Sequence, residues 1–120
     1  MEKLNVLIKT KYDIIGEAVA NVLNGTGMVK VLDIRNGDVT HEDIDFCMNN
    51  DAVTVIIGVN CNILVLLPFT AVTLDVPYNP HTSYLKYYNS FKEIAPSFIH
   101  TLFNCIRHSH HMPIVERDIG

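Results

Sequence analysis

The sequence of 120 residues contains no short motif with the spacing of a known catalytic, metal-binding or nucleotide-binding site. It also has no internal repeat and no low-complexity linker. Basic residues are scarce, since 9 Lys and Arg stand against 13 Asp and Glu and give a net charge of -4. This balance disfavours non-specific nucleic-acid binding by this domain through a basic surface. Fold and function therefore have to be inferred from hydrophobic patterning and from small groups of residues.

Cysteine is also sparse, with Cys47, Cys61 and Cys105 as its three positions. Their number is odd, they are widely spaced, and their neighbours are apolar. This pattern argues against a disulfide framework and favours reduced thiols in the core of a cytosolic protein. The apolar segment near the N-terminus is too short for a secretory signal. We therefore expect a cytoplasmic protein.

Charge is absent altogether from residues 52–74, a run of 23 residues. That length suffices for a transmembrane helix, which needs roughly 20 apolar residues. However, Asn60, Asn62 and Pro68 interrupt the run, and its many Val, Ile and Thr residues favour strands. We expect buried strands here, with a membrane span as the alternative.

The first half of the chain alternates strand-like and helix-like segments. Residues 4–8, 28–34 and 53–59 have the composition of strands. A helical spacing of apolar residues begins at Ile14, and Thr40 is a suitable cap for a second, shorter helix. This β-α-β-α-β order predicts a parallel sheet with right-handed crossovers.

The second half does not continue that alternation. Three residues separate the apolar block 53–59 from the next block, 63–69, whereas a parallel connection needs a dozen or more. We therefore expect an antiparallel hairpin there, unless one block is not a strand, and a further strand at residues 72–76. Residues 83–108 have a helical rhythm in which Pro96 begins a new helix or kinks a long one.

Residues 5–24, NVLIKTKYDIIGEAVANVLN, resemble the opening of a response-regulator receiver domain. In that family two acids at the end of the first strand bind Mg²⁺, an Asp ending the third strand accepts a phosphoryl group, and a Lys ends the fifth. Here Thr10 and Lys11 stand at the positions of the acid pair. Residues 58–60 stand near the position of the family's phosphoacceptor, and none of them has a carboxylate. Residues 72–76 also lack the Lys that ends the fifth strand in that family. The resemblance therefore implies a degenerate receiver that works without phosphorylation, because nothing would hold the cation.

The predicted fold is one α/β domain over residues 1–120. It has a three-layer flavodoxin- or receiver-like sheet with helices on both faces, and the hairpin would make the sheet mixed. A chain of this length with 48% hydrophobic residues can bury a core without disulfides or metal.

Ligand binding is predicted at the strand ends, where α/β proteins form their crevices. The candidate residues are Thr10, Lys11, Asp33 and Asn60. Backbone amides before the first helix and the charge of Lys9 and Lys11 could meet an anion there, although exposed lysines are typical of solvated surface. Cys61 lies at the same end, either as a nucleophile or as a buried residue of a turn.

The end of the last helix contains candidate metal ligands. Cys105, His108 and His111 follow a C-x-x-H-x-x-H spacing, which places three zinc-competent ligands on one helical face. The alternative is an exposed helix end whose imidazoles suit the negative dipole terminus. No nearby acid would orient a ligand, so we expect no cofactor.

An aromatic stripe formed by Tyr84, Tyr87, Tyr88 and Phe91 follows helical spacing. Tyrosine is enriched at interfaces because it combines apolar area with a polar tip. The stripe either covers the sheet or contacts a second copy, and we expect a homodimer contact.

Three functional hypotheses follow. The first is a non-enzymatic regulatory or protein-interaction module, receiver-like but without phosphoacceptor chemistry, which binds itself or another protein. The second is a small enzyme or ligand sensor with a pocket around Thr10, Asp33 and Asn60. The third is a small membrane-anchored protein.

Overall fold

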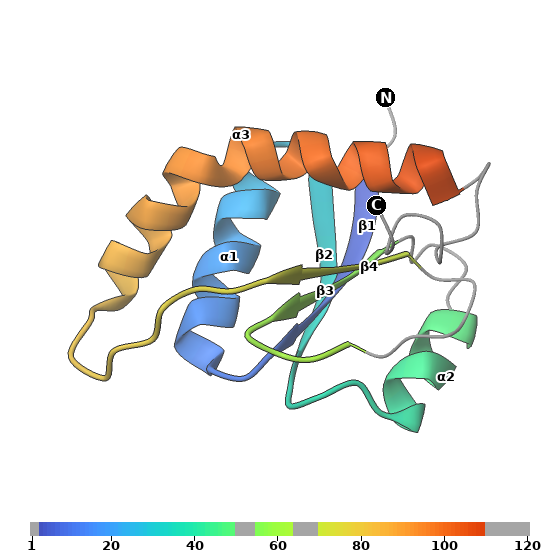
Figure 1. Cartoon of the computed structure of the whole chain (residues 1–120), viewed down its shortest axis with the longest axis horizontal. Helices are drawn as coiled ribbons and strands as arrows, with labels where there is room; N and C mark the ends of the chain where they lie inside the picture. Colours follow the sequence, from blue (N-terminus) through green and yellow to red (C-terminus); the bar gives the residue numbers. More distant parts are fainter. Residues whose placement is uncertain (1–2, 50–54, 64–69, 110–120) are drawn as a thin grey trace.

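The computed structural model describes residues 3–49, 55–63 and 70–109, with side chains as far as Ile106 (Figure 1). Its elements are β1 (Leu4–Thr10), α1 (Asp13–Gly25), β2 (Val29–Asn36), α2 (His41–Asn49), β3 (Val55–Val59), β4 (Thr70–Leu74) and α3 (Tyr84–Ser109). The predicted α/β class is confirmed, and the described part of the uncharged run forms two strands.

The four strands form one sheet in the order β2-β1-β3-β4. Every described pairing is parallel, from Leu4 opposite Val29 to Val59 opposite Leu74. The chain leaves β1 toward β2 through α1, and then crosses to β3 through α2. Successive right-handed crossovers in opposite directions place these two helices on opposite faces of the sheet. The order matches the first four strands of a flavodoxin-like sheet.

The antiparallel hairpin predicted after residue 59 is wrong for the described sheet, because the strand beside β3 is the parallel strand β4. Asn60 takes the left-handed conformation, with φ of 58°, and turns the chain out of β3. Ile63 then lies over the sheet: a Cβ added to Gly58 would be 2.5 Å from the Ile63 Cδ1 atom. Residues 64–69 of the predicted partner block lie outside the described residues.

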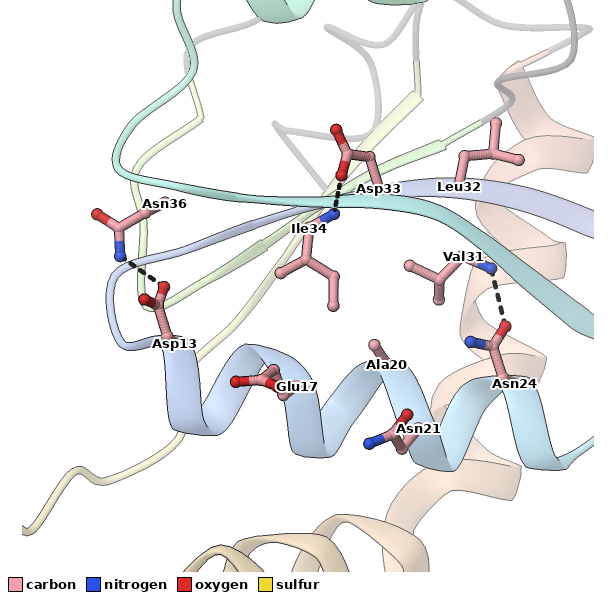
Figure 2. A pocket seen from close by; sticks show the side chains of 10 residues that line it. All are labelled: Asp13, Glu17, Ala20, Asn21, Asn24, Val31, Leu32, Asp33, Ile34 and Asn36. Atoms are coloured by element: carbon pink, nitrogen blue, oxygen red, sulfur yellow. Dashed lines mark hydrogen bonds between the residues drawn. The ribbon is translucent and has the colours of Figure 1, made fainter.

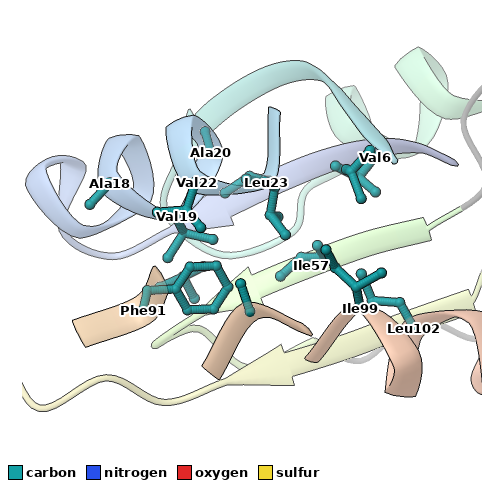
Figure 3. Packing of buried hydrophobic residues seen from close by; sticks show 14 of the residues in the cluster. Val6, Ala18, Val19, Ala20, Val22, Leu23, Ile57, Phe91, Ile99 and Leu102 are labelled. Atoms are coloured by element: carbon teal, nitrogen blue, oxygen red, sulfur yellow. The ribbon is translucent and has the colours of Figure 1, made fainter. Parts of the chain in front are cut away.

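The main core lies between the sheet and the pair α1 and α3 (Figure 3). One stripe of α1 supplies Val19 and Leu23, which meet Ile57 of β3 and Leu102 of α3, all 0–1% exposed. Each such side chain stabilises the fold by roughly 1.5–3 kcal/mol. A smaller cluster on the other face joins α2 to β1 and β3 through Cys47, Leu7 and Ile56.

Helix α3 is continuous over 26 residues and contains Pro96 in its interior. Figure 1 shows the helix bending along its length as it passes over the sheet. Proline lacks the N–H that would bond one turn back, so the alternative of a kinked single helix applies. No helix in the described part of the chain is long and apolar enough to cross a membrane.

Candidate functional site

The loops that follow all four strands line one polar cleft of about 330 Å³, here called the strand-end cleft. Its lining residues are Lys11, Gly37, Asp38, Asn60, Cys61, Asn62 and Asp75. It lies at the carboxyl end of the sheet, where the chain order reverses between β1 and β3. Crevices at this point are the usual ligand sites of open α/β sheets.

Asn60 forms part of the rim of the strand-end cleft, where it bonds to the backbone of Leu74 and Val76 as a further residue of β3 would. Its backbone N–H donates to the Leu74 carbonyl at 2.8 Å. Its side-chain Oδ1 accepts from the Val76 N–H at 2.6 Å, and its Nδ2 donates to the Val76 carbonyl at 2.8 Å. The amide is therefore occupied by the chain's own backbone, and Asn60 positions the rim.

Tyrosine side chains hold the segment that follows this rim. Tyr12, in the loop after β1, stacks on Tyr78 with ring centroids 3.8 Å apart and planes 3° apart. The Tyr87 hydroxyl donates to the Asn79 carbonyl at 3.0 Å and accepts from the Asn79 N–H at 2.9 Å. These contacts tie the segment after β4 to the loop after β1 and to α3.

The four predicted ligand residues do not all converge. Lys11 and Asn60 line the strand-end cleft. Thr10 is fully buried, and its hydroxyl donates to the Tyr12 carbonyl at 2.8 Å. A Cβ on Gly16 of α1 would lie 2.5 Å from its methyl, so Thr10 packs against α1 rather than the cleft.

Asp33, the fourth predicted ligand residue, is one of the residues around a separate polar groove of about 600 Å³ between α1 and the edge strand β2, but its carboxylate points away from α1 (Figure 2). Its Oδ1 accepts from the Ile34 N–H at 2.9 Å. Asn24 Oδ1 likewise accepts from the Val31 N–H at 2.9 Å. Side chains thus occupy backbone donors along the outer side of β2, which blocks the addition of another strand there.

A buried ionic cluster, which the sequence reading missed, lies on the α2 face of the sheet. Lys9 is 2% exposed, and its Nζ lies 2.8 Å from Asp43 Oδ2 and donates to the Asn36 carbonyl at 3.3 Å. Arg35 lies 3.3 Å from the other oxygen of Asp43 and 2.8 Å from Asp33. The expectation that Lys9 supplies charge to an exposed loop is therefore wrong. Alternation along β1 turns it toward α2.

Asp43 also caps α2, because its Oδ2 accepts from the Thr40 N–H at 2.8 Å. Burial alone would raise the pKa of Asp43, but the hydrogen bonds from Lys9 and Thr40 and the positive charge of Lys9 lower it below the ordinary value of 3.8. The carboxylate is therefore charged at neutral pH and joins β1, β2 and α2. The T-x-x-D spacing of a capping box was the sequence signal for it.

The two buried cysteines lack the surroundings of a nucleophile. Burial raises the pKa of Cys47, and burial together with the charge of Asp38 raises the pKa of Cys61. The Cys61 thiol donates to the Gly37 carbonyl at 3.5 Å. A reactive thiolate requires the opposite environment, in which positive charge or a base lowers the pKa.

The aromatic stripe lies mostly in the chain's own core. Tyr87 and Phe91 are 6% and 4% exposed. Both side chains therefore belong to the core that the chain forms by itself, and their part in a homodimer contact stays a prediction. The Tyr84 hydroxyl accepts from Asn21 Nδ2 of α1 at 2.6 Å, and Tyr88 is half-buried. A partner contact stays a prediction for Tyr84 and Tyr88.

The structure describes the side chain of one of the three predicted metal ligands. Cys105 is half-buried on α3, whereas the side chains of His108 and His111 lie outside the described residues. Within the described ranges, no group of three or more His, Cys, Asp or Glu residues could hold a metal ion.

Comparisons of the chain with protein-family models, with curated proteins and with solved structures find no match.

Proposed function

We propose that this chain is a non-enzymatic interaction module of receiver-like architecture, which works without phosphoacceptor chemistry and binds a second copy of itself. The observation that carries the proposal is the outer edge of β4. In a flavodoxin-like sheet of order 2-1-3-4-5, another strand lies at this position. In the described sheet β4 is the last strand.

The backbone groups along this edge follow from the bonds on the inner side of β4. The Leu74 carbonyl accepts from the Asn60 N–H, and the backbone N–H and C=O of Val76 both bond to the Asn60 side chain. The backbone groups of Leu74 and Val76 therefore point toward β3. Backbone groups alternate between the two sides of a strand. Those of Ala71, Thr73 and Asp75 therefore point outward, and none has a hydrogen bond in the described structure. We call these groups the β4 edge.

Apolar surface accompanies the β4 edge. A cleft of about 150 Å³ separates the end of β4 from α1 and α3, and Val76, Pro77 and Ile94 are among its lining residues. Ile94 is 48% exposed, although it borders the core residues Tyr87 and Phe91. Unpaired strand edges with apolar surface beside them are sites of protein association.

Sedimentation velocity over a wide concentration range tests the proposal. We expect reversible self-association of the wild type. Ile94→Asp should shift the equilibrium toward monomer, because it charges the apolar cleft. Leu85→Asp is the matched control, since Leu85 is 62% exposed on the same helix and does not line the cleft. A wild type that remains monomeric, or equal effects of the two variants, would contradict the proposal.

A second candidate function, ligand sensing, is supported by the strand-end cleft, which lies where the chain order reverses between β1 and β3. Lys11 lines the cleft together with Asp38 and Asp75, so it suits a small polar molecule that carries both positive and negative groups. Native mass spectrometry of the freshly purified chain should then show a retained small molecule. Lys11→Ala should lose it, and a wild type without added mass would argue against this candidate.

A further inference from the structure

We infer that two copies of this chain pair through antiparallel β4 strands centred on Thr73, which joins two four-stranded sheets into one. This inference rests on the proposed self-association and specifies its surface. The β4 edge offers the N–H and C=O groups of Ala71, Thr73 and Asp75, spaced evenly about Thr73.

The register follows from satisfying all these groups at once. With Thr73 opposite Thr73 of the second copy, Ala71 lies opposite Asp75, and Asp75 lies opposite Ala71. Outward-pointing residues of two antiparallel strands exchange N–H and C=O bonds pairwise. Each outward group in both copies then has a partner.

The side chains are complementary in the same register. Val72 and Leu74 point toward the α1–α3 core, and in the pair Val72 of one copy would lie opposite Leu74 of the other. Threonine would face threonine on the opposite side of the sheet, where Thr73 is exposed. The one charged residue, Asp75, meets alanine, so no like charges face each other. Apolar and Thr–Thr cross-strand pairs of this kind stabilise antiparallel strands.

The other edge of the sheet explains why the occupant is one second copy and why growth stops there. Asn24 and Asp33 accept hydrogen bonds from the Val31 and Ile34 N–H groups of β2. The edge of β2 therefore does not offer a β4 strand the same free N–H groups. The β4 strand of one copy thus pairs with the β4 strand of the other. Such a contact is two-fold and closed, unlike a head-to-tail contact that would extend into a filament.

Charge at position 73 tests this pairing, because residue 73 would meet its own copy at the two-fold axis. Thr73→Lys and Thr73→Asp should each weaken dimerisation about fivefold or more, since like charges directly opposite destabilise a strand pair. An equimolar mixture of the two variants should regain dimer as a heterodimer. Both should keep the circular dichroism spectrum, because Thr73 is exposed. Thr73→Pro removes an outward N–H without touching an internal bond, and it should also dissociate the dimer.

The outcomes separate this inference from the proposed function. A wild-type dimer that survives all three substitutions would leave self-association intact and overturn the β4 pairing. Dissociation of both charged variants without recovery on mixing would overturn the Thr73-centred register. A wild type that is monomeric at every concentration would overturn both the inference and the proposed self-association.

Discussion

Substitution of Lys9 by methionine should destabilise this protein more than its position beside a loop would suggest. The Lys9 and Asp43 side chains are 3% and 2% exposed and lie 2.8 Å apart. Lys9→Met leaves the buried carboxylate without its closest cation, and breaking a buried pair in this way costs about 3–5 kcal/mol. We expect the lower end, about 3 kcal/mol, because Thr40 and Arg35 still donate to Asp43.

The double variant Lys9→Met with Asp43→Leu separates the loss of the pair from the loss of a long side chain. With both charges removed no buried charge is left alone, and apolar replacements of buried pairs are often neutral. The remaining cost should be about 1 kcal/mol, for the unfilled cap at the Thr40 N–H. The double variant should therefore be more stable than the single one by about 2 kcal/mol.

Urea unfolding followed by circular dichroism measures these differences. Lys9→Met should also lower the melting temperature by about 10 °C. Lys11→Met is the matched control, because Lys11 is exposed, and it should change the free energy of unfolding by less than about 0.5 kcal/mol. A Lys9→Met variant within about 1 kcal/mol of the wild type, or a double variant no more stable than the single one, would refute the reasoning.

The remaining predictions concern acid, glycine, thiol and turn positions. Because the folded pKa of Asp43 lies below its ordinary 3.8, its stabilising contribution should be complete above that pH and lost as the pH falls through the folded pKa; Asp43→Asn should flatten this acid limb of the unfolding free energy. Gly16→Ala should cost about 1–3 kcal/mol in urea unfolding, because its Cβ would lie 2.5 Å from a buried threonine methyl, whereas Gly25→Ala, with nothing within 4 Å, should not destabilise. Cys61 should react with a thiol reagent at pH 8 far more slowly in the folded chain than in urea, and equal rates would contradict its burial. Asn60→Ala should be less stable than Asn60→Gly by about 1 kcal/mol, because both lose the Val76 bonds and only alanine is strained at positive φ.

The elements of the first half could be predicted from the sequence because local spacing determines them. Apolar residues at three- and four-residue intervals bury one face of α1, and continuous apolar runs become β1 and β3. The alternation of strands and helices then implies parallel pairing, since chirality leaves few ways to connect them.

The partner of β3 was not determined locally. The short polar interval after Val59 favoured a hairpin, yet the left-handed turn at Asn60 and the position of Ile63 over Gly58 direct the chain elsewhere. The competing interaction is the side-chain pairing of Asn60 with Val76, which is sixteen residues away in the sequence. A pattern of neighbouring residues contains no information about such a bond.

The candidate sites show the same difference between local sequence patterns and long-range contacts. The sequence by itself placed Lys11 and Asn60 at the ends of parallel strands, because strand ends of one sheet meet at one edge. Only the tertiary structure decided that Lys9 faces Asp43 in the core, that Tyr87 and Phe91 are buried, and that the outward backbone groups of Ala71, Thr73 and Asp75 have no hydrogen bond within the described part of the chain. The physical reason is that periodicity tells which side chains share a face. Which element packs against that face, and which edge stays without a partner, depends on contacts between residues distant in the chain.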